Sequence, residues 1–257
     1  MPGRSWRAWF IRTLLIGLLL YPSVQSAPIA GFLHAPQNDD HFVFLPFVSR
    51  TPPPGIYGRI TCAGEPLPGI TLTLWHFDVI SRGYVLFRYT ETQNDGSYRF
   101  SGLPSLPQDP GAMYYVTYEN GDHGNADNPA YLGYWLAPAI TSYEAGQNVS
   151  GGDFDLANVG KLTPAGGATV PFPVTFTWEP RPTSPEDSYT FEVYWQGEYY
   201  RHPWFTEFDL GYVGAYTLDT LPYDFAYQQE YEWNLRIRWP DGSYGSGYAG
   251  RTVTFSP

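Results

Sequence analysis

From residue 56 to the end of the chain, apolar and polar residues alternate with a period of two. The alternation is clearest in 231–239, where aromatic and aliphatic residues fill one set of positions and glutamate, asparagine and arginine fill the other. Successive side chains of a β-strand point to opposite faces, so this pattern predicts a strand with one dry face and one charged face. No stretch has a 3.6-residue apolar period long enough for a helix. The sequence therefore predicts an all-β fold.

The same alternation predicts further strands, which are separated by turn residues. In chain order the predicted strands are 56–62, 70–74, 84–89, 98–100, 113–118, 149–156, 174–178, 189–195, 231–239 and 253–255. An Asp-Gly pair at Asp95 and Gly96, set between two alternating runs, predicts a hairpin turn. Two tryptophans, Trp178 and Trp233, fall on the apolar faces of their strands, so we expect both in a core. Cys62 shares a strand face with Ile56, which predicts a small buried residue.

Composition supports short strands joined by tight turns. Aromatic residues make up 18% of the 257 residues and charged residues only 15%, with 27 glycines and 25 prolines. Disordered chains are poor in aromatics and rich in charge, so disorder is excluded. The formal net charge is −11, and Lys161 is the only lysine. A nucleic-acid partner is excluded as well, because binding nucleic acid requires a cationic patch.

The first 26 residues have the order of regions typical of an export signal. Three arginines precede an apolar run at 14–21, and small residues follow at 24 and 26, the two positions that a signal peptidase reads. The run is too short to span a bilayer, although an uncleaved anchor is the alternative. Removing residues 1–26, which carry three arginines and no acids, would take the net charge from −11 to −14. We expect an exported protein, extracellular or on the cell surface, with no membrane span in the mature chain.

Residues 27–54 read as a proline-rich leader, and two β-sandwich domains in tandem, both antiparallel, follow it. Residues 55–158 resemble the seven-stranded carboxypeptidase regulatory-like, or transthyretin-like, sandwich of secreted bacterial proteins. The resemblance rests on G-x-x-x-x-x-G-x-P-L-P-G-I from Gly58 and T-x-x-D-G-x-Y-x-F-x-G-L from Thr92. It implies an accessory sandwich without a catalytic domain.

Residues 159–257 resemble a fibronectin type III or related immunoglobulin-like module. The resemblance rests on the early strand that ends in Trp178, on Y-T-L-D-T-L-P at 216–222, and on Y-x-W-x-L-x-I at 231–237. The segment 197–212 is longer and more aromatic than such a module usually carries. Only residues 157–160 separate the last strand of the first domain from the second, so we expect the domains to form a semi-rigid rod.

Motifs that carry chemistry are missing. The chain has no H-E-x-x-H, no G-x-S-x-G, no phosphate loop and no dinucleotide fingerprint, and no two of its five histidines have metal-ligand spacing. Carboxylates are frequent, and paired carboxylates can hydrolyse a glycoside, but acidic residues on loops are usually solvated. We therefore expect no enzyme, no cofactor, no catalytic residue and no assigned metal ligand.

Two groups of residues allow a binding hypothesis. The loop from Asp122 to Asn128 presents side-chain oxygens that a hard cation such as calcium could use, or it is an ordinary polar loop held by Asn and Asp turns. The aromatic residues Tyr199, Tyr200 and Trp204 could stack on sugar rings, or they cover the ends of the cores. Exposure of the three as a coplanar row would favour sugar.

Two functions follow from these alternatives. In the first, the chain is a non-enzymatic structural or interaction protein whose sandwiches act as spacers and binding modules for a cell-envelope protein. In the second, it is a carbohydrate-binding protein that uses the aromatics of the second domain, with a glycan as its partner. The sequence identifies neither the ligand nor the oligomeric state.

Overall fold

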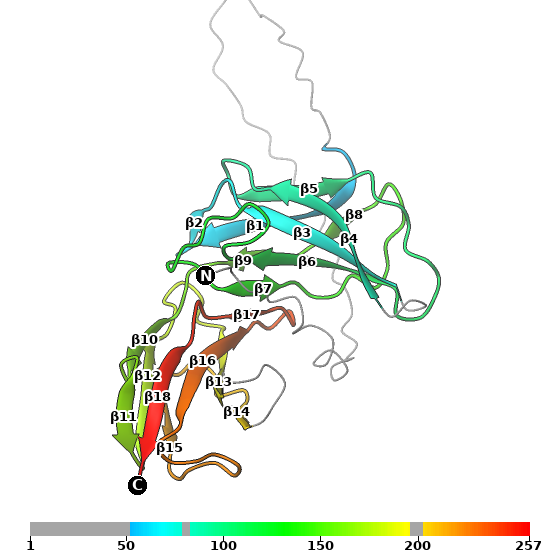
Figure 1. Cartoon of the computed structure of the whole chain (residues 1–257). Helices are drawn as coiled ribbons and strands as arrows, with labels where there is room; N and C mark the ends of the chain where they lie inside the picture. The colour runs from blue at the N-terminus through cyan, green and yellow to red at the C-terminus, as the bar shows by residue number, and fades with distance from the viewer. Residues whose placement is uncertain (1–51, 79–82, 196–202) are drawn as a thin grey trace, which may run out of the picture. The chain divides into compact units, whose positions relative to one another are not determined.

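The computed structural model describes residues 52–78, 83–195 and 203–257 (Figure 1). These residues form strands, turns and loops and contain no helix, which confirms the all-β prediction. Within these three ranges, no helix is long and apolar enough to cross a membrane. The predicted export signal lies outside the described residues and stays a prediction.

The first half of the described chain holds two sheets. Its strands are β1 (Gly55–Cys62), β2 (Glu65–Pro66), β3 (Thr71–Asp78), β4 (Gly83–Glu91), β5 (Ser97–Ser101), β6 (Met113–Glu119), β7 (Tyr134–Leu136), β8 (Asn148–Ser150) and β9 (Phe154–Asp155). In one sheet β1 pairs with β2, β5, β8 and β9, and in the other the order is β4-β3-β6-β7. Ile56, Leu74, Phe100, Val116 and Trp135 are buried with their neighbours in the core.

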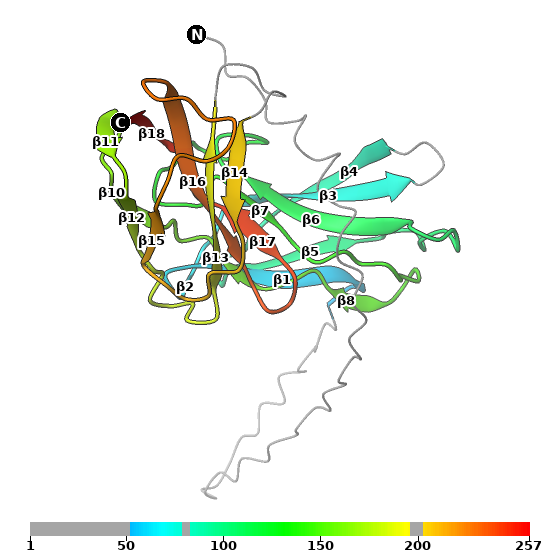
Figure 2. The ribbon, with the colours of Figure 1, turned by 90° about the horizontal axis from the view of Figure 1, so that it is seen from below.

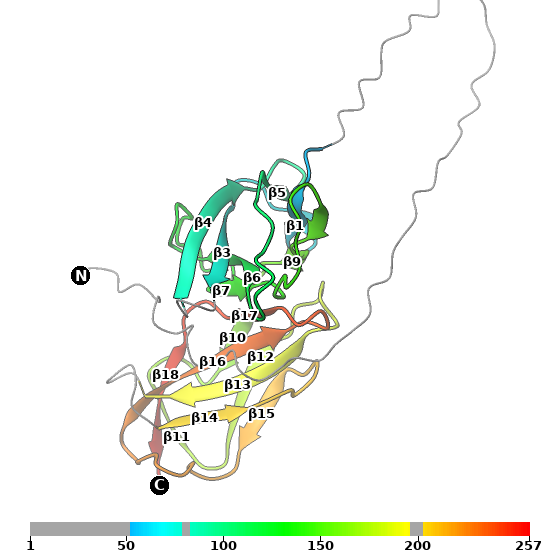
Figure 3. The same ribbon diagram turned by 90° about the vertical axis from the view of Figure 1, so that its right-hand side faces the viewer.

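The second half repeats the two-sheet plan. Its strands are β10 (Gly160–Thr163), β11 (Ala168–Pro171), β12 (Val174–Glu179), β13 (Ser188–Tyr194), β14 (Trp204–Glu207), β15 (Ala215–Leu218), β16 (Glu230–Arg238), β17 (Tyr244–Ser246) and β18 (Arg251–Ser256). One sheet has the order β10-β12-β15; the other contains β11, β18 and β16, with β13 between β16 and β14 (Figure 3). The rings of Phe176 on β12 and Trp233 on β16 lie 5.2 Å apart. Trp178 and Trp233 are both buried, as predicted.

One sheet runs through both halves. β7 of the first half pairs antiparallel with β17 of the second, so that ten strands form a single sheet from β4 to β11 (Figures 1 and 2). Directly opposite residues of an antiparallel pair share a face. Trp135 lies opposite Gly245, and Gly245 lies opposite Ile237, so both cores lie on the same face of this sheet. We call the other face the outer face.

Two cations are buried next to this pairing, and one of them, Arg181, connects the halves. Arg181 binds Asp187 through two hydrogen bonds of 2.7 and 2.8 Å and donates to the carbonyl oxygen of Asp155 at 2.6 Å. Lys161 donates to the carbonyl oxygens of Tyr248 and Ala249 at 3.1 and 2.7 Å. Burial lowers the pKa of Lys161 to about 8. Both side chains donate hydrogen bonds to backbone carbonyl groups that would otherwise need water as a hydrogen-bond partner.

Two expectations about the first half are wrong. The turn at Asp95 and Gly96 forms, and the backbone N–H of Gly96 donates to the carbonyl of Gln93 at 2.8 Å. It does not make a hairpin, because β4 pairs with β3 and β5 pairs with β1, so the turn carries the chain between sheets. Cys62 is only half-buried, because it lies at the end of β1 where the core residues stop.

The charged face predicted for 231–239 is also wrong in part. Glu232 and Asn234 on the outer face of β16 are 6% and 3% exposed. The phenol of Tyr194 donates to Glu232 at 2.5 Å, and the amide of Asn234 donates to the carbonyl oxygen of Gly247 at 3.2 Å. Polar side chains can be buried when partners satisfy them, which alternation alone does not reveal.

Candidate functional site

The outer face of the ten-stranded sheet gathers polar and aromatic side chains from both halves. Cross-strand register places Glu119, Tyr134, Ser246, Arg236 and Thr190 in one row, each opposite the next on the neighbouring strand. The row crosses from β6 to β13 and so passes over the β7–β17 junction. Residues that are distant in sequence therefore share one face of the sheet, on which Thr190 and Asn234 are buried.

Trp204 stands at the second-half end of this face. It lies opposite Tyr194 in the β13–β14 pair, and the two rings are 5.7 Å apart at an angle of 51°. The guanidinium of Arg236 lies 5.6 Å from the centre of the Trp204 ring. Trp204 is 39% exposed. A partly exposed indole supported by a cation can stack on a ligand ring, although its tilt toward Tyr194 is not coplanar.

The other two predicted ligand-binding residues, Tyr199 and Tyr200, lie outside the described residues. The expected row of Tyr199, Tyr200 and Trp204 is therefore tested only at Trp204. The sequence also groups Tyr194 with these aromatic residues, whereas sequence reasoning missed Arg236 as a neighbour of Trp204. The contacts of Trp204 with Tyr194 and Arg236 both come from cross-strand register, which the alternation pattern does not fix.

Two carboxylates on the outer face are buried beside Trp204. Glu192 accepts from the guanidinium of Arg236 at 3.0 Å. Burial raises the pKa of Glu192 to about 7, and Arg236 opposes this shift. Glu232 accepts from the phenol of Tyr194, whose pKa burial holds well above its ordinary value. Each carboxylate therefore has a hydrogen-bond partner within the fold, which is typical of a structural role. Because its pKa is about 7, Glu192 changes its charge near neutral pH.

Tyrosines occupy the middle of the outer face. The rings of Tyr134 and Tyr244 lie 6.2 Å apart across the junction, and those of Tyr84 and Tyr115 lie 6.1 Å apart in the first half. Burial raises the pKa of all four phenols. They are therefore neutral at physiological pH, and their contribution to this face is ring packing and neutral hydrogen bonding.

The loop from Asp122 to Asn128 uses two of its amides to hold its own shape. Asn125 accepts from the backbone N–H of Thr71 at 2.9 Å and donates to the carbonyl oxygens of Thr71 and Glu119 at 2.9 and 3.0 Å. Asn128 accepts from the backbone N–H of Ala130 at 2.9 Å. These bonds fit the polar-loop alternative for both asparagines, because their oxygens are already engaged.

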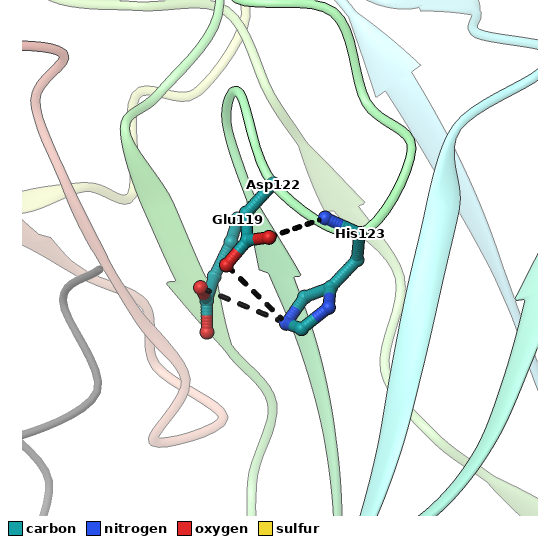
Figure 4. Close-up of side chains that lie close together, drawn as sticks. All are labelled: Glu119, Asp122 and His123. Carbon is teal, nitrogen blue, oxygen red and sulfur yellow. Dashed lines mark hydrogen bonds and ion pairs between the residues drawn. The ribbon is translucent and has the colours of Figure 1, made fainter. Parts of the chain in front are cut away.

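A tighter cluster lies at the start of this loop. Figure 4 shows the carboxylates of Glu119 and Asp122 directed toward the imidazole of His123. The Nε2 atom of His123 is 3.8 Å from Oε2 of Glu119 and 3.7 Å from Oδ2 of Asp122. One donor atom from each residue lies within 4.8 Å of the others. The sequence signal was available, since Glu119 and His123 are four residues apart, but Glu119 lay outside the loop that we considered.

The strands and the sheets they form define an all-β protein built from β-sandwiches. No family model matches this chain. No curated protein matches it either. Among solved structures it is similar to a DUF3823 family protein from Bacteroides ovatus, with 12% sequence identity and a TM-score of 0.27. That match covers 79% of this chain and 99% of the other.

Proposed function

We propose that this chain is an exported, non-enzymatic protein of the cell surface whose sandwich halves act as spacer and binding modules. The observation that carries the proposal is the pairing of β7 with β17, which makes one sheet out of two halves. A sheet that is continuous through the joint resists rotation between the halves, and a spacer needs that resistance. The described residues between 52 and 257 belong to one compact unit.

The second half supports the fibronectin type III or immunoglobulin-like assignment in its strand order. Such modules place strands A, B and E in one sheet and C, F and G in the other. Here β10, β12 and β15 take the first set of places, and β13, β16 and β18 the second. Tyr231 at the start of β16 exchanges hydrogen bonds with the backbone N–H and carbonyl of Ala226 at 2.7 and 3.2 Å. This contact resembles the tyrosine corner of those modules.

The first half supports the transthyretin-like assignment through its strand count. β8 and β9 both pair parallel with β1 and together act as one strand that is interrupted at 151–153. With β8 and β9 counted as one and the two-residue β2 set aside, seven strands remain in two sheets. Seven strands are what the resemblance implies.

Two measurements test this proposal. Mass spectrometry of the protein from its native cells should find an N-terminus near residue 27, and protease treatment of intact cells should degrade the protein. Recovery of an intact N-terminus from the cytosol would contradict export. Small-angle scattering of the full-length chain should fit one fixed arrangement of 52–257, and a requirement for many orientations would contradict the spacer.

Carbohydrate binding is the second candidate, and the exposed indole of Trp204 favours it. The test is a glycan array probed with the full-length chain and with Trp204→Ala. Tyr223→Ala is the matched control, because Tyr223 is 92% exposed in the same half. We expect a sugar ligand to lose at least tenfold in affinity with Trp204→Ala and to keep its affinity with Tyr223→Ala. Carbohydrate binding is rejected if the array gives no signal, or if both variants retain the signal of the parent.

A further inference from the structure

The end of β6 and the turn that follows it place two carboxylates and an imidazole around one point (Figure 4). The two distances from Nε2 of His123, 3.8 Å to Glu119 and 3.7 Å to Asp122, exceed a hydrogen bond of about 2.7–3.2 Å. Neither carboxylate is therefore within hydrogen-bond distance of Nε2 of the imidazole. The separation instead approaches that of donors around a tetrahedral zinc ion, which is about 3.3–3.4 Å for bonds of about 2.0–2.1 Å.

The imidazole is held in an orientation that a metal ligand requires. Its other nitrogen, Nδ1, lies 3.2 Å from the phenol oxygen of Tyr89 on β4. The ring of Trp75 meets the imidazole edge-on, with centroids 6.4 Å apart. A metal-binding histidine almost always uses its second nitrogen in a hydrogen bond, which fixes the tautomer and the ring. In the tautomer in which Nδ1–H donates to the phenol oxygen of Tyr89, the lone pair of Nε2 points toward the two carboxylates.

The carboxylates are also pre-positioned. The backbone N–H of His123 donates to Oδ1 of Asp122 at 2.8 Å, which leaves Oδ2 turned toward Nε2. Asn125 holds the backbone carbonyl of Glu119 at 3.0 Å. The side chain of His123 is 7% exposed and that of Asp122 is 39% exposed, so solvent reaches the cluster past Asp122. An ion therefore has a path of entry.

We infer that Glu119, Asp122 and His123 form a binding site for a divalent transition-metal ion of the zinc type. Two carboxylates and one neutral imidazole match the donors that zinc prefers, and their two negative charges balance its charge. Three protein ligands leave a fourth position for water. Calcium fits less well, because it takes six to eight oxygen ligands, and the neighbouring Asn125 uses its oxygen to accept from Thr71.

Zinc titration of the full-length, metal-free chain tests the inference. Isothermal titration calorimetry with a zinc salt should give one ion per chain. His123→Asn and Asp122→Asn should each weaken binding at least tenfold. Asparagine suits the first variant because His123 has φ of 54°, a left-handed conformation that asparagine tolerates. Asp127→Asn is the matched control, since it neutralises a carboxylate of the same loop outside the cluster, and its affinity should stay within about twofold.

Cobalt gives an independent readout of ligand identity. Cobalt bound in place of zinc should show the visible absorption of a low-coordinate site, and His123→Asn should abolish it. Circular dichroism and the melting temperature of each variant establish that it is folded. The inference is overturned if no stoichiometric zinc binds, or if a folded His123→Asn variant binds as tightly as the parent. Calcium binding that Asp127→Asn abolishes and His123→Asn retains would also overturn it, in favour of an oxygen-only site.

Discussion

Arg181 at the junction offers the sharpest test of how the halves are held together. Its guanidinium is buried and makes four hydrogen bonds, two to the carboxylate of Asp187 and two to the backbone carbonyls of Asp155 and Ala157. It also lies 4.9 Å from the ring centre of Trp239. Arg181→Met keeps most of the volume and removes the charge. The change leaves a buried carboxylate and two carbonyls without their partner.

We expect Arg181→Met to lower the free energy of unfolding by about 3–5 kcal/mol, the usual cost of breaking a buried ion pair from one side. That is a large part of the about 5–15 kcal/mol that a domain holds. The double variant Arg181→Met/Asp187→Leu should recover part of the loss, since it removes the Asp187 carboxylate but leaves the carbonyls of Asp155 and Ala157 without their donor. Arg59→Met is the control on an exposed arginine, and we expect it within about 0.5 kcal/mol of the parent.

The pH dependence of the Arg181→Met variant separates charge from packing. Burial raises the pKa of Asp187, and Arg181 opposes the rise through hydrogen bonding and charge. Without Arg181 the pKa of Asp187 rises further above its unfolded value. The stability deficit should therefore be largest at neutral pH and shrink as pH falls and Asp187 takes up a proton. Urea unfolding followed by tryptophan fluorescence measures each value. A deficit below about 1 kcal/mol, or a double variant as unstable as the single one, would refute this account of the junction.

Three further predictions concern single side chains. Trp233→Ala should cost about 3–5 kcal/mol because it empties a site enclosed by both sheets; a melting temperature close to that of the exposed control Tyr223→Ala would contradict it. In the folded protein Glu192 has a pKa of about 7, against an ordinary value of 4.5. Protonated Glu192 therefore stabilises the fold by up to about 3 kcal/mol below pH 4.5, and this stabilisation is lost as the pH rises to about 7.5. Denaturation of Glu192→Gln over this range should lack that slope, and an unchanged slope would argue against the assignment. Burial raises the pKa of the half-buried Cys62, so a thiol reagent at pH 8 should label the native protein several-fold more slowly than the unfolded chain, and equal rates would contradict it.

Period-two alternation was sufficient to locate most of the long strands and their core faces. β12, β13 and β16 lie where it placed them, and their tryptophans are buried because apolar surface on one face must be covered. It did not predict partners. The turn at Asp95 and Gly96 satisfied every local requirement for a hairpin, yet β5 pairs with β1, because strand pairing is decided by how the sheets close around the core.

The candidate sites depend on contacts that are still less visible in the sequence. Trp204 was identified from residue type alone, but its neighbours Tyr194 and Arg236 follow from the register of β13 against β14 and β16. The cluster around His123 required an imidazole that is oriented by Tyr89, thirty-four residues earlier in the chain. A local motif scan considers ligand spacing along the chain, whereas these groups meet because neighbouring strands bring them together.

The continuity of the sheet depends on a small residue at the joint. A Cβ atom on Gly245 would lie 2.8 Å from the side chain of Leu132 and 3.1 Å from the carbonyl oxygen of Tyr134, so a side chain at this position would require Leu132 and the β7 backbone to shift. Because β17 pairs with β7, the outer face carries residues of both halves. If a ligand spans that face, weakening the junction through Arg181→Met should weaken binding even in a folded protein. If the ligand stacks on Trp204 alone, the second half suffices and the same variant should bind as the parent does. The Arg181→Met variant, measured for binding as well as stability, thus separates a surface shared between the halves from a site confined to one of them.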